Sequence, residues 1–184
     1  KTILSNLDYE FDIIFNLAAQ AGVRYSIENA AEVTKNNIVS ALNILEYALN
    51  NDVKKVVYAS SSSVYGNPIY TPCDEVHPKN PISPYGVAKL CGEIYADYYF
   101  REYKLPVTSL RFYTVYGPRG RPDMAIRKFF NLIFQNKEIS IYGDGSQLRD
   151  FTYVSDLVNG LILAGEKAES SGEAFNLGCS NPIS

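Results

Sequence analysis

An uninterrupted apolar run leads directly into a row of serines near the middle of the chain. Residues 55–59 (KVVYA) are rich in β-branched and aromatic side chains, and Ser60, Ser61, Ser62 and Ser63 follow at once. A short run of this kind predicts a strand buried on both faces, as in a parallel sheet. We therefore expect serine hydroxyls at the carboxyl end of a strand, where open α/β sheets bind their ligands.

Strand and helix patterns alternate along the first part of the chain. The predicted elements are, in order, a strand at 11–17, a helix at about 30–50, the strand at 55–59, a helix at 85–103 and a strand at 105–112. Such alternation predicts a parallel, doubly wound α/β sheet.

The pattern changes after residue 115. A loop rich in Gly, Pro and Arg is followed by a predicted helix at about 124–135 and a short predicted strand at 139–142. The last residues, 176–184, read as a strand and a turn. We interpret residues 116–184 as part of a smaller α/β substrate lobe, interleaved with the last strands of the first domain.

A tyrosine and a lysine stand four residues apart at the start of the predicted helix 85–103. Tyr85 and Lys89 therefore share one helix face, and the Lys89 ammonium can lower the phenol pKa from its usual value near ~10. Ser61 can share a hydrogen bond with the same substrate oxygen. The spacing alone is frequent by chance, but here it accompanies serines at a strand end. Ser61, Tyr85 and Lys89 are the candidate catalytic residues.

Charge, cysteine and histidine content exclude several function classes. The net charge is −3 and no basic run of five residues occurs, which argues against nucleic-acid binding. Cys73, Cys91 and Cys179 fit neither a zinc site nor a disulfide framework, so we expect reduced thiols in a cytoplasmic protein. The single His77 cannot build a histidine metal site, and we expect no metal. No apolar segment approaches ~20 residues, so no membrane span is expected.

The serine turn and Tyr85-Gly86-Val87-Ala88-Lys89 together resemble the Ser/Tyr/Lys constellation of the extended short-chain dehydrogenase/reductase family. The resemblance implies NAD as cofactor and residues 1–115 as the C-terminal part of an NAD-binding Rossmann-like domain. The implied cofactor-binding residues are Leu17, Ala18, Ala19, Asn36, Asn37, Ala59, Ser60, Tyr85, Lys89, Phe112 and Tyr113.

One part of the family pattern is missing from this sequence. A dinucleotide-binding fold opens with a Gly-rich turn between its first strand and first helix, where backbone amides meet the pyrophosphate. No such glycine cluster occurs here. We therefore expect the chain to be the middle of a longer protein, without that N-terminal βα unit.

Residues 114–125 are most similar to UDP-glucuronate 4-epimerases, which implies a UDP-sugar substrate. The implied substrate-binding residues are Ser62, Ser63, Thr114, Arg121, Met124, Ile141, Tyr142 and Arg149. Arg121 suits a sugar carboxylate, although a solvated loop arginine is the alternative interpretation. Relatives that dehydrate or decarboxylate their sugar generally carry an acid in the serine turn, and this chain has none. The resemblance therefore implies reversible oxidation at one carbon, through a 4-keto sugar.

Other functions remain open at this stage. UDP-glucose or UDP-N-acetylglucosamine 4-epimerases use the same machinery, and a nucleotide-sugar dehydratase is a further alternative. A binding or scaffold domain without catalysis is the non-enzyme alternative, because the Gly-rich loop is missing. The helix at 85–103 carries more apolar surface than one sheet face needs. We therefore also expect a homodimer in which this helix and the helix near residues 33–48 pair with their copies across a two-fold axis, as in relatives with this pattern.

Overall fold

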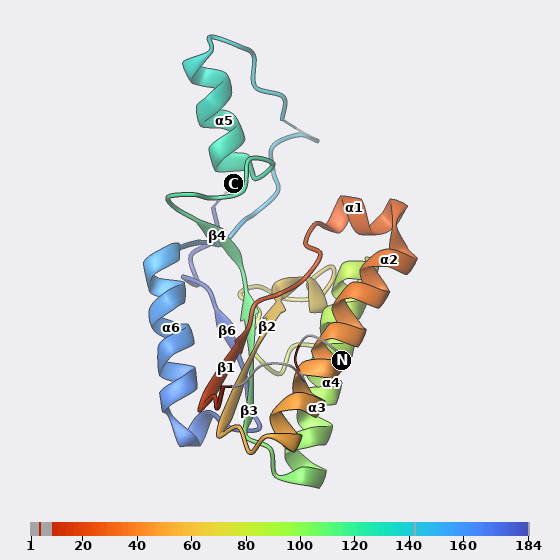
Figure 1. Ribbon diagram of the computed structural model, residues 1–184. Coiled ribbons are helices and arrows are strands. Elements are labelled where there is room, and N and C mark those ends of the chain that lie inside the picture. Colours follow the sequence, from red (N-terminus) through yellow and green to blue (C-terminus); the bar gives the residue numbers. More distant parts are fainter. Residues whose placement is uncertain (1–3, 5–8, 142, 184) are drawn as a thin grey trace.

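The centre of the molecule is a parallel β-sheet with helices on both faces (Figure 1). The computed structural model describes residues 4, 9–141 and 143–183. The strands, in sheet order, are β1 (Ile13–Asn16), β2 (Lys55–Ser61), β3 (Val107–Phe112) and β6 (Ala174–Leu177). Every neighbouring pair runs parallel. The predicted α/β architecture with a parallel sheet is confirmed.

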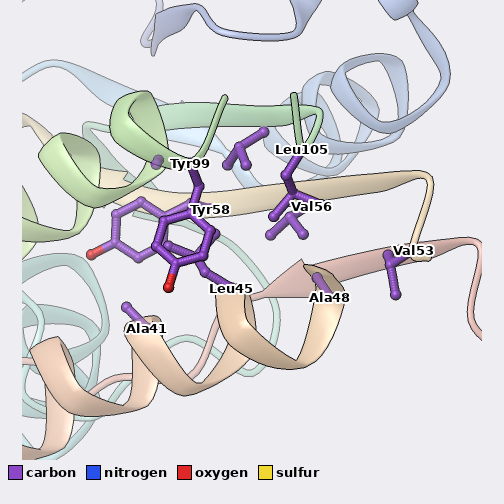
Figure 2. Packing of buried hydrophobic residues seen from close by; sticks show 10 residues of the cluster. Ala41, Leu45, Ala48, Val53, Val56, Tyr58, Tyr99 and Leu105 are labelled. Atoms are coloured by element: carbon purple, nitrogen blue, oxygen red, sulfur yellow. The ribbon is translucent and has the colours of Figure 1, made fainter. Parts of the chain in front are cut away.

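One face of the sheet carries the larger apolar core, formed with α3 (Ser40–Asn50) and α4 (Pro84–Tyr103). Leu45 of α3 and Tyr99 of α4 pack with Tyr58 of β2, as Figure 2 shows. Full burial of one such side chain contributes about 1.5–3 kcal/mol. This core holds α4 against the strand that leads into the serines.

The opposite face is covered by α6 (Val154–Glu166), followed by the short η4 (Ala168–Ser170). Leu157 and Leu161 of α6 pack on Val57 and Leu110. Both faces of β2 and β3 are therefore buried, which is why these strands read as apolar runs.

The helix α4 has clear signals at both ends. The Ser83 hydroxyl accepts a hydrogen bond from the Gly86 amide at 3.1 Å, and Pro84 occupies the first turn, where its missing N–H costs nothing. Lys104 ends the helix in a left-handed conformation, with φ of 57°. The predicted span of 85–103 is thus correct to one residue. Within the described part of the chain, no helix combines the length and apolar character needed to cross a membrane.

The predicted single helix at 30–50 is divided in the structure. It consists of α2 (Ala30–Thr34), a π-helical turn η2 (Lys35–Val39) and α3, and the short α1 (Val23–Glu28) precedes it. No glycine or proline causes the change. Asn37 lies inside the π turn, and π turns often occur at functional sites.

A separate two-stranded parallel sheet pairs β4 (Thr114–Tyr116) with β5 (Phe151–Tyr153), and α5 (Ala125–Phe134) lies beyond it (Figure 1). The strand predicted at 139–142 is wrong for residues 139–141, which form no regular structure. A strand needs a neighbour for its backbone groups, and the described chain brings none to this segment. Tyr142 lies outside the described residues. The domain division at 115/116 stays a prediction.

Candidate active site

A cleft of about 1520 Å³ opens at the carboxyl ends of β2 and β3. It gathers predicted site residues from segments that are far apart in the sequence. The predicted residues that line it are Ser60, Ser61, Ser62, Ser63, Tyr85, Phe112, Tyr113, Thr114, Arg121, Met124 and Arg149. The cleft therefore unites most of the predicted catalytic and substrate-binding residues at the sheet edge where α/β folds bind ligands.

The serine turn is rigid and internally bonded. The strand β2 continues two residues further than predicted and ends at Ser61, which caps the 3₁₀ turn η3 (Ser62–Val64). The Ser61 hydroxyl accepts a hydrogen bond from the Ser63 amide and donates one to the Ser63 hydroxyl, both at 3.2 Å. This cap fixes the Ser61 oxygen at the rim of the cleft.

Tyr85 and Lys89 occupy the first turns of α4 and point toward the end of β2. Lys89 is 3% exposed, and its ammonium donates a hydrogen bond of 2.6 Å to the Ala59 carbonyl. The Lys89 nitrogen lies 5.9 Å from the centre of the Tyr85 ring. The structure thus brings together all three candidate catalytic residues, with Lys89 buried behind the tyrosine.

The electrostatics differ from the prediction that Lys89 lowers the Tyr85 pKa. Burial raises the pKa of Tyr85, while the hydrogen bond with Ser61 and the charge of Arg121 act in the opposite direction. Burial also lowers the pKa of Lys89 to about 8. Low-dielectric surroundings disfavour both charged forms, which explains both directions. The charge of Arg121, which the sequence indicated only as a substrate ligand, therefore also acts on the phenol.

Asn37 is buried and stabilises the loop after β1. Its side-chain oxygen accepts a hydrogen bond from the Gln20 amide at 2.7 Å, and its side-chain nitrogen donates to the Gln20 carbonyl at 3.1 Å. Gln20 itself lines the cleft. Both side-chain groups of Asn37 are engaged with this backbone, so Asn37 orients the loop, and its predicted contact with a cofactor stays a prediction.

Other predicted cofactor residues are not among those that line the cleft. Leu17 and Ala18 are exposed, Ala19 is half-buried, and Asn36 is exposed on the π turn. The buried Ala59 contributes its carbonyl to Lys89.

Arg121 has both a structural partner and a place at the cleft. Its guanidinium donates to Asp123 from Nε at 3.0 Å and also from Nη2, while its side chain remains 46% exposed. Asp123 lines the cleft as well. The solvated-loop interpretation is thus only partly correct, because the ion pair is exposed and still acts on Tyr85.

Of the remaining predicted substrate residues, two line the cleft and one does not. Met124 caps α5 at the cleft, and Arg149 lies there with Nη1 donating to the Leu148 carbonyl at 2.7 Å. Ile141 is 66% exposed and does not line the cleft.

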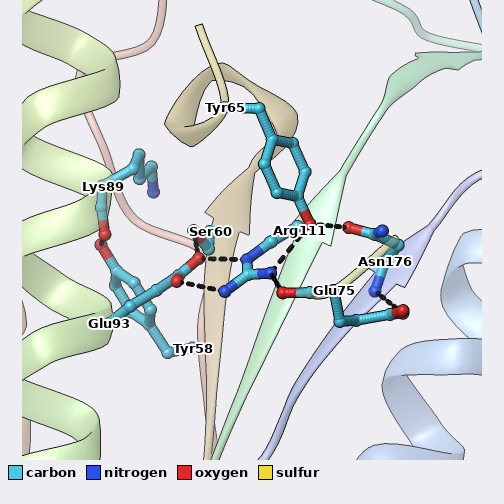
Figure 3. Close-up of polar contacts among 8 residues, drawn as sticks. All are labelled: Tyr58, Ser60, Tyr65, Glu75, Lys89, Glu93, Arg111 and Asn176. Carbon is cyan, nitrogen blue, oxygen red and sulfur yellow. Dashed lines mark hydrogen bonds and ion pairs between the residues drawn. The ribbon is translucent and has the colours of Figure 1, made fainter. Parts of the chain in front are cut away.

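A buried polar cluster that was not predicted lies beneath the cleft and is drawn in Figure 3. Glu93 of α4 and Arg111 of β3 form an ion pair of 2.8 Å and are 7% and 2% exposed on their side chains. The Arg111 guanidinium also reaches Tyr65, which lines the cleft. A signal existed in the sequence, because an arginine inside a predicted buried strand requires a partner.

Known proteins are similar to this chain over nearly its whole length. Residues 4–178 match the model of the family described as "NAD dependent epimerase/dehydratase family". The chain is 40% identical to a UDP-glucuronate 4-epimerase of Thermodesulfobacterium geofontis, covering 100% of this chain and 56% of the relative.

Two solved structures are also similar over nearly the whole chain. One is the UDP-glucuronic acid 4-epimerase of Bacillus cereus in complex with UDP-glucuronic acid and NAD (TM-score 0.90, 36% identity, 98% of this chain and 59% of that one). The other is the UDP-N-acetylglucosamine 4-epimerase of Methanobrevibacter ruminantium (TM-score 0.91, 33% identity, 98% and 60%). The chain spans about half the length of the curated relatives it matches.

Proposed function

Because the chain belongs to the NAD dependent epimerase/dehydratase family, we propose that the whole protein is an NAD-dependent nucleotide-sugar 4-epimerase that interconverts UDP-glucuronate and UDP-galacturonate. The observation that carries this proposal is the meeting of Ser61 and Tyr85 at one cleft, with Lys89 buried behind them. The similarity to proteins named UDP-glucuronate 4-epimerase supports the choice of sugar.

The residues of the cleft have distinct roles in this proposal. Tyr85 accepts the proton of the sugar 4-hydroxyl and later returns it, while the Ser61 hydroxyl holds the same oxygen. Lys89 has three N–H donors and the Ala59 carbonyl takes one, which fits an additional ribose hydroxyl of the cofactor. NAD, when bound, supplies reversible hydride acceptance at C4. The Ser61 hydrogen bond and the Arg121 charge favour the phenolate against the effect of burial.

The acidic groups at the cleft argue for epimerisation over dehydration. A dehydratase needs a further acid beside the sugar, whereas residues 61–63 supply only hydroxyls. The carboxylates among the described lining residues are Asp74, Glu75, Asp123 and Asp150. Each already accepts a hydrogen bond from another group of the chain. None of the four belongs to the serine turn, where a dehydratase would place its acid.

The choice of a uronate rests on Arg121. A guanidinium at the cleft can bind the C6 carboxylate through two parallel hydrogen bonds, a geometry that neutral hexoses cannot use. The sugar must then share Arg121 with Asp123 or replace it, since Asp123 occupies the same nitrogens.

The test is turnover of three sugars by the purified full-length protein. We expect UDP-glucuronate to give UDP-galacturonate, with UDP-glucose and UDP-N-acetylglucosamine converted much more slowly, when products are identified by NMR. The Tyr85→Phe variant is the control for background conversion. Preferred turnover of a neutral sugar would contradict the uronate assignment, and loss of water or carbon dioxide from the sugar would contradict the reaction.

We also propose that the protein is a homodimer that pairs α4 with its copy across a two-fold axis. The exposed apolar residues on α4 are Val87, Ile94, Tyr95, Tyr98 and Tyr103. They lie on a helix whose other side packs on the sheet, so a second copy would cover an otherwise wet apolar face.

A further inference from the structure

Three side chains form one polar row across the sheet, directly beneath the cleft. Ser60 of β2 pairs in register with Arg111 of β3, which pairs with Asn176 of β6. Each stands one position before the last residue of its strand. The strand positions nearer the amino ends of β2 and β3 are mostly apolar. This row is therefore a polar layer between the apolar core and the cleft.

Glu93 of α4 covers this row. Its Oε1 accepts hydrogen bonds from the Ser60 hydroxyl at 2.5 Å and from Arg111 Nε at 2.9 Å, and its Oε2 accepts from Arg111 Nη2 at 2.8 Å. Figure 3 shows the carboxylate reaching from the helix to both strands. A two-point fork of this kind fixes the orientation of both partners.

Arg111 also holds two further residues that line the cleft, Tyr65 and Glu75. Arg111 Nη1 donates to the Tyr65 hydroxyl at 2.8 Å and to the Glu75 carbonyl at 3.0 Å. The Tyr65 hydroxyl donates in turn to Asn176 at 2.7 Å. The Arg111 guanidinium therefore connects β3 to three other segments: α4, the turn after β2 and the loop at Glu75.

Helix geometry links Glu93 to the candidate catalytic residues. Tyr85, Lys89 and Glu93 are spaced four residues apart, so they follow one face of α4. Lys89 bonds the Ala59 carbonyl and Glu93 bonds the side chain of the next residue, Ser60. Two successive turns of α4 are therefore attached to two successive residues of β2, immediately before Ser61.

Stability alone does not explain such an arrangement. Well-packed apolar residues in place of a buried ion pair are often as stable or more stable, because charges lose their hydration on burial. The hydrogen bonds instead fix where α4 lies along β2, and this sets the position of Tyr85 relative to Ser61.

We propose that Glu93, together with Ser60 and Arg111, positions Tyr85 against Ser61 for the proton transfer. None of the three acts on the reacting atoms, so they are positioning residues. The kinetic part of this inference rests on the proposed epimerase function, whereas the structural part does not.

The first test is Ser60→Ala in the full-length protein, because it removes one hydroxyl and leaves the ion pair intact. Thr108→Val is the matched control. Thr108 lies on β3, is fully buried and donates its hydroxyl to the Ser170 carbonyl at 2.7 Å, far from the cleft. Ser60→Ala loses its hydrogen bond to Glu93, whereas Thr108→Val loses those to the Ser170 carbonyl and hydroxyl. The control therefore removes at least as much buried hydrogen bonding as the test, which separates positioning from stability.

Hydrogen exchange monitored by mass spectrometry reads the attachment directly. We expect Ser60→Ala to speed exchange in peptides covering residues 58–62 and 84–92, and Thr108→Val to leave both peptides unchanged. Equal exchange in the wild type and Ser60→Ala would overturn the inference. Hydrogen exchange needs no substrate, so it tests the attachment of α4 to β2 even if the protein fails to epimerise any UDP-sugar.

Kinetics supply the second readout. For Ser60→Ala we expect kcat to fall roughly 10-fold, with the KM for the sugar unchanged and a shifted pH profile of kcat measured at saturating NAD, because a small displacement of catalytic groups can cost up to about 100-fold. Thr108→Val should keep the kcat and pH profile of the wild type. A normal kcat in Ser60→Ala, or an equal loss in both variants, would contradict a positioning role.

A double variant, Glu93→Leu with Arg111→Met, completes the test. If the pair were merely structural, the apolar replacement would restore both stability and kcat. We expect a lower melting temperature, because the Ser60 hydroxyl and the Glu75 carbonyl also lose a buried partner, and a low kcat at temperatures where the variant is fully folded. Recovery of full kcat would refute the proposal.

Discussion

Replacing Lys89 with Met is expected to make the cofactor-free protein more stable while it destroys catalysis. The Lys89 ammonium is buried, and its pKa falls from 10.5 to about 8. At pH 7 the lysine is charged in both the folded and the unfolded protein. Burial of this charge therefore lowers the unfolding free energy by about 1.36 × (10.5 − 8), on the order of 3 kcal/mol. Met avoids this cost and has a similar shape, but it loses the hydrogen bond to the Ala59 carbonyl. The expected net gain is about 1–3 kcal/mol.

The pH dependence gives the sharper test. Between pH 8 and pH 10.5 the unfolded chain binds more protons at this lysine than the folded chain does, so the unfolding free energy of the wild type rises with pH in this window. At pH 9.5 the remaining cost is about 1 kcal/mol, and the difference in unfolding free energy between Lys89→Met and the wild type should narrow accordingly.

Urea unfolding of both proteins at pH 7, 8.5 and 9.5, after removal of NAD, measures the gap. Other groups that titrate in this range affect both proteins equally and cancel in the difference. Lys54→Met, at an exposed lysine paired with Asp12, is the control and should show no comparable gain. A destabilised Lys89→Met, or a gap independent of pH, would refute the reasoning.

Three further outcomes are expected. Tyr85→Phe should lower kcat by about 10²–10⁴-fold with nucleotide binding retained, and a variant that keeps more than about a tenth of wild-type turnover would exclude Tyr85 as the base. Arg121→Ala should lower kcat/KM for UDP-glucuronate by about 1.5–3 kcal/mol more than for UDP-glucose, whose smaller loss reflects the missing charge beside Tyr85. The ion-paired Arg101→Ala should change neither, and equal losses on both sugars would remove the basis for uronate choice. Ile94→Lys, at a position 60% exposed, should convert the dimer to a monomer in light scattering, and a wild type that is already monomeric would contradict pairing through α4.

Most of the sheet could be predicted because its strands are buried on both sides. The runs that became β2 and β3 are apolar in sequence, and the ends of α4 have local signals in Ser83 and Pro84. The π turn η2 could not be predicted, because the periodicity of 30–50 is unbroken. Its Asn37 is held by Gln20, seventeen positions earlier, and that contact is invisible before folding.

The candidate site also has features that local sequence patterns predict and features that depend on folding. Ser61, Tyr85 and Lys89 were found by spacing and by the end of one strand, and both are local patterns. The pKa of Tyr85 could not be predicted, since it depends on how deeply the ring is buried and on the charge of Arg121 across the cleft. Glu93 was within reach, because it stands four residues after Lys89 on the same helix face.

The position of β6 has a consequence for how the protein is made. β6 joins the sheet beside β3, although about sixty residues separate the two strands in the sequence. During synthesis the edge of β3 that will pair with β6 therefore stays without hydrogen-bond partners. Tyr65, which accepts from Arg111, likewise lacks its acceptor Asn176 until that residue has been made. Long-range parallel pairing is slow, and an open edge can recruit another chain. Newly made molecules should therefore be most prone to aggregation, and most dependent on chaperones, in the interval before Asn176 leaves the ribosome.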